Sequence, residues 1–369
     1  MQDRIARELD AEILRTIEAW HRHGTGIAEG DFDDLALRLF AYQIERNEPY
    51  GRFCASFGFS KSAMPPSWEA VPPVPAAAFK EATLATFDPA KAVLAFETSG
   101  TTTGSGGRHF FDTRALYDAA LLAGFDRFVL GDGARLRYLN LVPNPADRPQ
   151  SSLGYMMGRV SAQRGDGQTG WYVRGEGLLL SAFFADLDAA IAEGAPVCIA
   201  STAFALVAVL DALRENGRAV RLPAGSRVME TGGFKGRTRV LSHEELYERA
   251  CERLGITQDA IVAEYGMTEL TSQYYDDVRA DPSHAAPSRR RKLSPPWLRA
   301  RVVGPDGETL RGGIVGALVH VDLANRGSCV AVQTDDLGVQ FDDGLVLIGR
   351  DAGASLRGCS LDAESLARL

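Results

Sequence analysis

The segment Phe96–Gly107 reads FETSGTTTGSGG and concentrates hydroxyl side chains and glycines in one short stretch. Glycines let backbone N–H groups converge on an anion because no Cβ stands in the way, and Ser and Thr hydroxyls add rotatable donors. The apolar run Ala92–Phe96 is typical of a short buried strand, and Asp112 or Thr113 can cap a helix after it. The segment predicts a phosphate-binding loop where a strand ends, although a run of this composition alone is about as often a surface linker.

Three later segments favour the binding loop over the linker. EYGMTE occupies Glu264–Glu269 directly after the apolar run Ala260–Ala263, TDDLG occupies Thr334–Gly338, and IGRD occupies Ile348–Asp351. In this order and at these separations they resemble the core motifs of the adenylate-forming enzymes, the superfamily of acyl-CoA synthetases, luciferases and peptide-synthetase adenylation domains. A P-loop ATPase is disfavoured because no Gly-Lys-Ser/Thr follows the glycines.

Further segments narrow this resemblance to one branch. They are VMETGGFK at Val228–Lys235, DLANRGS at Asp322–Ser328, LRGCSL at Leu356–Leu361, and Val71–Pro75 with Phe79-Lys80. Together they resemble the acyl-protein synthetase family, which contains the bacterial luminescence fatty-acid activating subunit and relatives near phenazine pathways. The resemblance covers nearly the whole chain. It implies an α/β fold, the large-domain fold of adenylate-forming enzymes, with parallel-rich sheets flanked by helices, a small β subdomain, and truncation at the C-terminus.

The chain divides by the character of its segments. We expect an N-terminal helical segment over 1–85, an α/β nucleotide- and acyl-binding core over 86–290, a β subdomain over 291–350, and a C-terminal stub with Cys359 over 351–369. Expected core elements are a helix over Thr113–Leu130, a strand over Pro196–Ile199, a helix over Ala203–Asn216, and a helix from the capping box at Ser242–Glu245 to Gly255. Short β runs are expected at 299–303, 314–321, 329–333 and 345–348.

The resemblance assigns a nucleotide contact to each motif. Thr98, Ser99, Gly100, Thr101, Thr102, Thr103 and Gly104 would hold the β- and γ-phosphates of ATP, and the backbone at Gly232 and Gly233 would approach the adenine edge. Within Tyr265-Gly266-Met267-Thr268-Glu269, it places Tyr265 against adenine, Thr268 on the α-phosphate as a catalytic group, and Glu269 on Mg²⁺. Asp336 would accept from both ribose hydroxyls, with Arg350 contacting the ribose as well.

The motifs do not show which residue supplies a positive charge to the phosphates. Superfamily members carry Pro-Lys just after the loop, where this chain has Gly106-Gly107-Arg108-His109. They also carry a catalytic lysine in a C-terminal domain of about a hundred residues, which does not fit into Asp351–Leu369. Either Lys235 as a catalytic residue, Lys80, Arg108 or a partner protein is therefore expected to supply the charge, or adenylation is expected to be slow.

Cys359 is a candidate acyl acceptor, because in the luminescence enzymes a cysteine near the C-terminus takes the acyl group from AMP. We expect ATP- and Mg²⁺-dependent activation of a fatty or aromatic carboxylic acid, as in phenazine or other antibiotic biosynthesis. The acyl group would then pass to Cys359 or directly to a partner reductase or acyltransferase. The alternative is a catalytically weak subunit that binds nucleotide or acyl-adenylate and acts in assembly.

The composition limits which partners and which cellular compartment we expect for the chain. A formal charge of −8 and a sequence pI near 5.4 disfavour nucleic acid and anionic membranes as partners. The basic run Arg289–Lys292 is expected to be a solvated loop, although its place between two of the nucleotide motifs would also let it attract phosphates. Residues 1–20 lack the apolar region of a signal peptide, which predicts a cytoplasmic protein without membrane insertion. Five cysteines without paired spacing predict reduced thiols and no zinc site.

Overall fold

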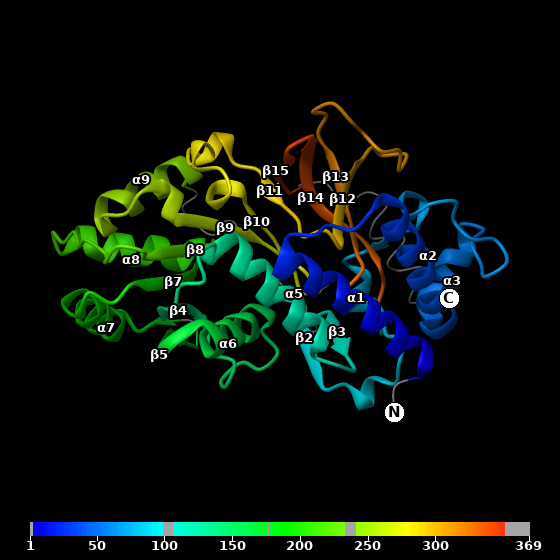
Figure 1. Cartoon of the computed structure of the whole chain (residues 1–369), viewed down its shortest axis with the longest axis horizontal. Helices are drawn as coiled ribbons and strands as arrows, with labels where there is room; N and C mark the ends of the chain where they lie inside the picture. Colours follow the sequence, from blue (N-terminus) through cyan, green and yellow to red (C-terminus); the bar gives the residue numbers. More distant parts are fainter. Residues whose placement is uncertain (1–2, 99–105, 176, 233–240, 351–369) are drawn as a thin grey trace. The chain divides into compact units, whose positions relative to one another are not determined.

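The computed structural model describes residues 3–98, 106–175, 177–232 and 241–350, and it divides into two compact units. Unit 1 contains Met1–Ala123, Met267–Gln273 and Ser294–Leu369, and unit 2 contains Gly124–Gly266 and Tyr274–Leu293. The chain therefore leaves unit 1 and returns to it twice. Figure 1 labels the helices and strands.

Unit 1 begins with three helices, α1 (Arg4–His23), α2 (Glu29–Arg46) and α3 (Glu48–Ser56). The unit continues with β1 (Val74–Pro75), α4 (Ala78–Glu81), β2 (Leu94–Glu97), β3 (Arg108–Phe111) and the first part of α5 (Ala115–Phe125). Its last strands are β12 (Leu298–Val303), β13 (Gly316–Asp322), β14 (Ala331–Phe341) and β15 (Gly344–Arg350).

The C-terminal strands of unit 1 form an antiparallel sheet in the order β12-β13-β14-β15. These strands correspond to the four β runs expected from the sequence. Strand β1 pairs in parallel with β14, with Val74 opposite Val332, so the Pro-rich segment adds a strand to this sheet. The β subdomain is thus joined to the N-terminal part of the chain by backbone hydrogen bonds.

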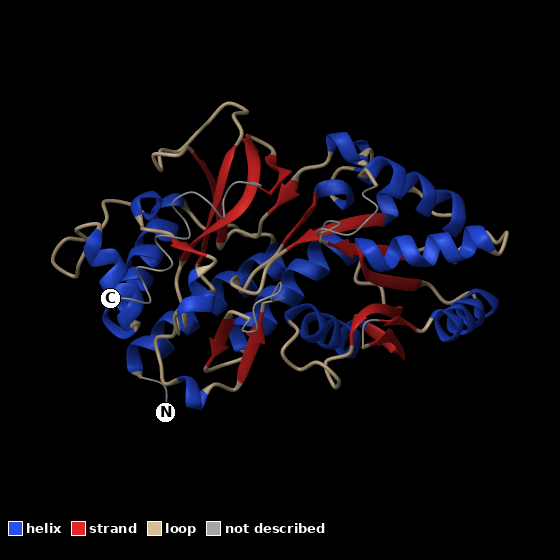
Figure 2. Cartoon of the chain, turned by 180° about the vertical axis from the view of Figure 1, so that it is seen from behind, coloured by secondary structure: helices blue, strands red, loops and turns tan. Residues whose placement is uncertain are grey.

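Unit 2 alternates strands and helices: β4 (Leu136–Pro143), α6 (Ser152–Arg164), β5 (Gly165–Arg174), β6 (Gly177–Leu178), α7 (Leu180–Glu193), β7 (Val197–Thr202), α8 (Ala203–Glu215), β8 (Arg227–Thr231), α9 (His243–Leu254), β9 (Ile261–Tyr265), β10 (Tyr274–Asp276) and β11 (Lys292–Leu293). Neighbours in the series β9-β8-β7-β4-β5 pair in parallel, in agreement with the parallel-rich sheets that the family resemblance implied. Strands β10, β11 and β6 add antiparallel pairs at the two ends. Figure 2 shows helices packed along these strands.

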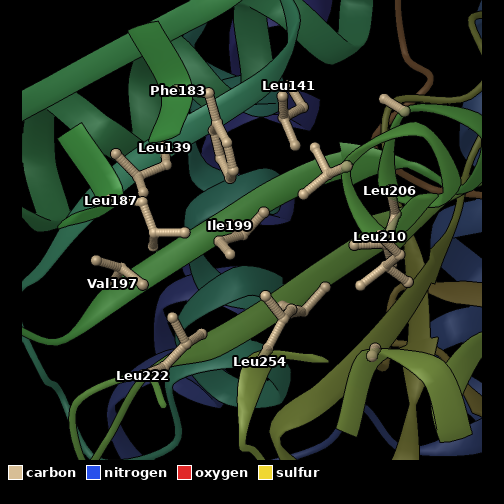
Figure 3. Close-up of a cluster of buried hydrophobic side chains, with 14 of the residues drawn as sticks. Leu139, Leu141, Phe183, Leu187, Val197, Ile199, Leu206, Leu210, Leu222 and Leu254 are labelled. Atoms are coloured by element: carbon tan, nitrogen blue, oxygen red, sulfur yellow. The ribbon is translucent and has the colours of Figure 1, made fainter. Parts of the chain in front are cut away.

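One hydrophobic cluster covers a face of the unit 2 sheet (Figure 3). Leu139 of β4 and Ile199 of β7 project from adjacent strands into the cluster, which also contains Phe183 of α7 and Leu206 of α8. Fully burying a side chain of this size contributes roughly 1.5–3 kcal/mol, so the cluster stabilises the packing of α7 and α8 against these strands.

Local signals predicted two helix ends in this unit correctly. The Ser242 hydroxyl accepts from the Glu245 N–H at 3.1 Å to start α9, and Gly255 ends it in a left-handed conformation with φ 62°. The helix expected to reach Leu130 is α5 followed by a π-helix over Asp126–Leu130, which ends at Gly131. Short 3-10 helices occupy Trp68–Ala70, Pro89–Lys91, Gln258–Ala260, Asp277–Arg279, Pro282–His284 and Pro287–Arg289.

Candidate functional site

The carboxyl ends of β8 and β9 bring two of the predicted nucleotide contacts together. Thr231 lies opposite Glu264 in the parallel register, so Gly232 and Tyr265, the next residues, lie at the same edge of the unit 2 sheet. Ligands of open α/β sheets bind at this edge of the strands. Gly232 has φ 76°, and a Cβ added there would meet no atom of the described residues within 4 Å, so its backbone conformation favours glycine. The Tyr265 ring packs 5.7 Å from the Tyr274 ring.

Glu264 is a buried acid at this edge that the sequence reasoning did not single out. Its carboxylate accepts a short hydrogen bond from the Thr231 hydroxyl. Burial raises the pKa of Glu264 to about 7, although the Thr231 hydrogen bond and the Lys292 charge oppose this shift. An acidic residue within the otherwise apolar strand Ile261–Tyr265 was the signal available in the sequence.

The basic run Arg289–Lys292 was expected to be a solvated loop, and this is wrong for two of its members. Arg290 pairs with Asp276 at 2.7 Å and donates to the Ile261 carbonyl at 2.6 Å. Lys292, with a side chain 12% exposed, pairs with Asp276 at 2.8 Å and donates to the Ala263 carbonyl at 2.7 Å. Burial alone would raise the pKa of Asp276, but these two cations outweigh it and hold the pKa below its usual value. Arg290 and Lys292 therefore stabilise β9, since each donates to a carbonyl of that strand and has its buried charge paired with Asp276.

The segment Met267–Gln273 belongs to unit 1 and carries Thr268 and Glu269. The ring nitrogen Nδ1 of His109 lies 2.8 Å from the Thr268 carbonyl oxygen, and Asn325 Nδ2 donates to the Glu269 carbonyl at 2.9 Å. The Thr271 hydroxyl donates to Asn325 Oδ1 at 2.6 Å. Successive backbone carbonyls are thus held by side chains, in a stretch that is neither helix nor strand.

Asp322 holds the same segment through its backbone amides. Its carboxylate accepts from the Thr271 N–H at 3.0 Å, the Ser272 N–H at 2.8 Å and the Ser272 hydroxyl at 2.9 Å. Burial raises the pKa of Asp322 to about 6 against these hydrogen bonds. The motif DLANRGS therefore holds the segment Met267–Gln273 through Asp322 and Asn325, and Asn325 reaches Glu269 of the EYGMTE motif.

Arg326 of the same motif has a structural role. Its guanidinium is buried and pairs with Asp10 of α1 at 2.7 Å and with Asp112, directly after β3, at 2.6 Å. Removing one partner of a buried ion pair costs about 3–5 kcal/mol, so this triad fixes α1 and the end of β3 within unit 1.

The glycine-rich segment joins two antiparallel strands rather than a strand and a helix. Strands β2 and β3 form a hairpin in which Phe96 lies opposite His109. Where the connecting residues leave the two strands, the Thr98 N–H donates to the Gly107 carbonyl and the Gly107 N–H donates to the Thr98 hydroxyl, both at 2.8 Å. A Cβ on Gly107 would lie 2.9 Å from the Phe79 carbonyl carbon and 3.1 Å from Lys80 Cγ, so only glycine fits beside α4. The strand β3 was not predicted.

Asp336 and Arg350 face each other across β14 and β15, and Arg350 Nε donates to Asp336 Oδ1 at 2.8 Å. The Asp336 side chain is 15% exposed and that of Arg350 is 61% exposed. Burial lowers the pKa of His320 to about 4, with the Asp336 charge acting in the opposite direction, so a neutral imidazole accompanies this pair. The structure thus brings together the two residues predicted to contact the ribose.

Several predicted residues lie outside the described residues: Ser99, Gly100, Thr101, Thr102, Thr103, Gly104, Gly233, Lys235 and Cys359. Within the described part of the chain, no helix is long and apolar enough to cross a membrane. The described ranges also contain no group of three or more His, Cys, Asp or Glu side chains that would hold a metal.

Solved structures show that this arrangement is the fold of the adenylate-forming enzymes. A 2-hydroxyisobutyryl-CoA ligase in an open conformation matches with TM-score 0.63 and 14% identity, over 87% of this chain and 74% of that one. A long-chain-fatty-acid-CoA ligase from Archaeoglobus fulgidus matches with TM-score 0.51 and 14% identity, over 72% and 52%. The McyG A-PCP structure, complexed with phenylalanyl-adenylate, matches with TM-score 0.50 and 18% identity, over 72% and 48%.

The family described as "Acyl-protein synthetase, LuxE" matches residues 175–364, slightly more than half of the chain. The chain belongs to this family, as its motifs predicted. Comparison with curated proteins gave no match. The chain spans about half the length of the first solved structures that it resembles, 48% to 50%.

Proposed function

We propose that this chain activates a carboxylic acid by adenylation. A carboxylate oxygen attacks the α-phosphorus of ATP, a new P–O bond forms, and the bond from the α-phosphorus to the β-phosphate oxygen breaks, releasing pyrophosphate and acyl-AMP. The protein's task is to orient two anions and to stabilise the charge that develops between them. Family membership supports this reaction, and the observation that carries it is the fixed backbone of Thr268 and Glu269.

The phosphate contacts we propose belong to unit 1. Thr268 lies in the segment whose carbonyls are held by His109 and Asn325, and its hydroxyl would donate to the α-phosphate. Residues Thr98–Gly104, which connect β2 to β3, would contact the β- and γ-phosphates through backbone N–H groups and hydroxyls.

Lys80 is the cation that we propose for these phosphates. Arg108 pairs with Glu97 across the hairpin at 3.0 Å, which compensates its charge. Lys80 is exposed, its stem passes the base of the hairpin at Gly107, and it forms no ion pair with any other residue that the structure describes. A flexible ammonium with three donors suits phosphate as a point charge.

Glu269 is the proposed Mg²⁺ ligand. Mg²⁺ sites of phosphoryl-transfer enzymes use one or two carboxylates together with substrate phosphates, so a single buried Glu fits without a larger cluster of protein ligands. Bound Mg²⁺ would neutralise charge on the leaving pyrophosphate. The chain's own contribution is to hold Glu269 in place through Asn325.

For the adenosine part, we propose that Tyr265 stacks on the adenine and that Gly232, Gly233, Gly266 and Met267 approach it through backbone. Asp336 would accept from the vicinal ribose hydroxyls, with Arg350 fixing its carboxylate. The register of β8 with β9 supports the first set of contacts, and that of β14 with β15 supports the second.

We further propose that Cys359 is the acyl acceptor. Its thiolate would attack the carbonyl carbon of acyl-AMP, a C–S bond would form, and AMP would leave. A reductase or acyltransferase would then take the acyl group. The substrate class is a fatty or aromatic carboxylic acid, including a phenazine acid.

Exchange of labelled pyrophosphate into ATP, dependent on added acid, tests the adenylation. A panel of medium-chain, long-chain and aromatic acids should give exchange with at least one class. Acid-independent nucleotide binding without exchange would favour the alternative, an assembly subunit that binds nucleotide or acyl-adenylate.

A further inference from the structure

His109 is a buried imidazole that no proposed catalytic role uses. It lies on β3, 1% exposed, two residues after Gly107 at the base of the hairpin. Its Nδ1 lies 2.8 Å from the carbonyl oxygen of Thr268, a residue 159 positions later in the chain. One side chain therefore connects the hairpin that carries the glycine-rich segment to the residue that would contact the α-phosphate.

The charge and tautomer of His109 follow from its surroundings. Burial lowers the pKa of His109 to about 4, although the hydrogen bond to Thr268 opposes the shift, so the ring is neutral at physiological pH. A carbonyl oxygen only accepts hydrogen bonds. Nδ1 therefore carries the hydrogen and donates it to Thr268.

Aromatic neighbours fix the plane of the imidazole. The Phe111 ring lies 4.2 Å from it at an interplanar angle of 34°, and the Phe79 ring lies 5.7 Å away at 68°. Offset and edge-on ring contacts of this kind favour one ring orientation. The Nδ1–H direction is thereby set before any ligand binds.

We propose that His109 is a positioning residue that fixes the Thr268–Glu269 peptide relative to strands β2 and β3, so that this peptide keeps one geometry during adenylation. The part that concerns catalysis rests on the proposed function. The Thr268 carbonyl belongs to the peptide plane that leads into Glu269, whose own carbonyl is held by Asn325. Two consecutive peptide planes are then fixed, and with them the direction of the Cα–Cβ bond of Glu269, which lies between them.

Two variants separate the hydrogen bond from the packing. His109→Leu keeps an apolar side chain of similar bulk but leaves the Thr268 carbonyl without its donor. His109→Asn places an amide nitrogen at the same distance along the side chain as Nδ1, so it restores the donor. His109→Gln carries its amide one carbon farther and serves as the control with a misplaced donor.

The first measurement is acid-dependent pyrophosphate exchange with its kinetic constants separated. For His109→Leu and His109→Gln, kcat should fall by roughly ten- to a hundredfold while KM for ATP changes by less than about threefold, because the lost contact acts on geometry rather than on nucleotide binding. His109→Asn should recover kcat to within about threefold of wild type. If kcat falls equally in His109→Leu and His109→Asn, and the melting temperatures of the two variants fall with it, His109 has a packing role and the proposal is overturned.

The second measurement does not depend on activity. Hydrogen–deuterium exchange of the peptide covering Met267–Gln273 in the ligand-free chain should accelerate by about tenfold or more in His109→Leu and stay near wild type in His109→Asn. Unchanged protection in His109→Leu would overturn the positioning role. If the wild-type chain shows no pyrophosphate exchange, the proposed adenylation is wrong. The hydrogen–deuterium exchange of the Met267–Gln273 amides would still decide whether His109 is a positioning residue.

Discussion

Arg350 donates from Nε to Asp336 Oδ1 at 2.8 Å across the β14–β15 pair, although the two residues are 14 positions apart. The guanidinium is largely exposed, whereas the carboxylate is mostly buried. The arginine therefore orients an acid that faces limited solvent.

Asp336→Ala should weaken ATP binding by about 2 to 4 kcal/mol, roughly thirty- to a thousandfold, because the charge-assisted contacts to the ribose are lost. Calorimetric titration with ATP and Mg²⁺ measures this directly. Asp342→Ala, on the exposed turn between the same two strands, is the matched control and should bind normally. If Asp336→Ala binds ATP as tightly as wild type, Asp336 does not belong to the site.

Glu269→Gln should spare nucleotide binding more than turnover. The amide keeps the shape of the side chain but loses the charge that attracts Mg²⁺. Pyrophosphate exchange measured across a series of Mg²⁺ concentrations should show a higher metal requirement and a lower maximum. Glu308→Gln, at an exposed loop position, controls for the change of net charge. A Glu269→Gln enzyme with the wild-type metal requirement would place Mg²⁺ elsewhere.

Lys80→Ala should slow adenylation at least about tenfold, since an ammonium near the phosphates stabilises the charge of the departing pyrophosphate. Arg108→Ala should have a smaller effect, because Glu97 already compensates Arg108. Lys91→Ala, which removes an exposed lysine beside Asp88, is the matched control. Single-turnover formation of acyl-AMP reports the rate. An Arg108 effect larger than the Lys80 effect would reverse the assignment.

The sequence predicted local features well and long-range contacts poorly. The ends of α9 depend on Ser242 and Gly255 beside the helix itself, so they are visible in a short window. Strand β3 has four residues, and its pairing with β2 decides its state, so periodicity could not identify it. The role of Asn325 depends on a carbonyl 56 residues away, which no local pattern encodes.

The motif resemblance predicted the family and the fold. It did not distinguish structural from functional basic residues. Arg290 lies in a basic run that looks solvated, yet it is buried against Asp276 and stacks 4.5 Å from the Tyr247 ring. Burial of a charge is decided by distant partners, so composition alone predicted the wrong environment for it.

Glu264→Gln should stabilise the chain above neutral pH. A carboxyl group whose pKa is raised in the folded state, here from 4.5 to about 7, binds its proton more tightly in that state. This favours folding at low pH, and the advantage is lost as pH rises from about 4.5 to about 7. The neutral glutamine of the variant has no such pH dependence. The free energy of unfolding of Glu264→Gln should therefore increase relative to that of wild type across this range, by on the order of 2 to 3 kcal/mol.

Paired thermal unfolding of wild type and Glu264→Gln at pH 5 and pH 8 measures this difference. Asp322, whose pKa is also raised, is present in both chains and cancels from the comparison. The glutamine oxygen still accepts from the Thr231 hydroxyl, so the hydrogen bond is retained. A difference in melting temperature that is the same at both pH values would show that Glu264 is not titrating in this range.

Cys359 divides the two routes for the acyl group. If it is the acceptor, Cys359→Ala should still form acyl-AMP but carry no covalent acyl group after incubation with acid, ATP and Mg²⁺. Cys359→Ser should retain a more stable oxygen ester, because the serine ester transfers its acyl group onward more slowly. Cys251→Ala, at a half-buried cysteine on α9, is the control and should acylate normally. Intact mass spectrometry with hydroxylamine treatment identifies the thioester. Acylation at another cysteine, or none in a wild-type chain that still supplies its partner enzyme, would show direct transfer of the adenylate instead.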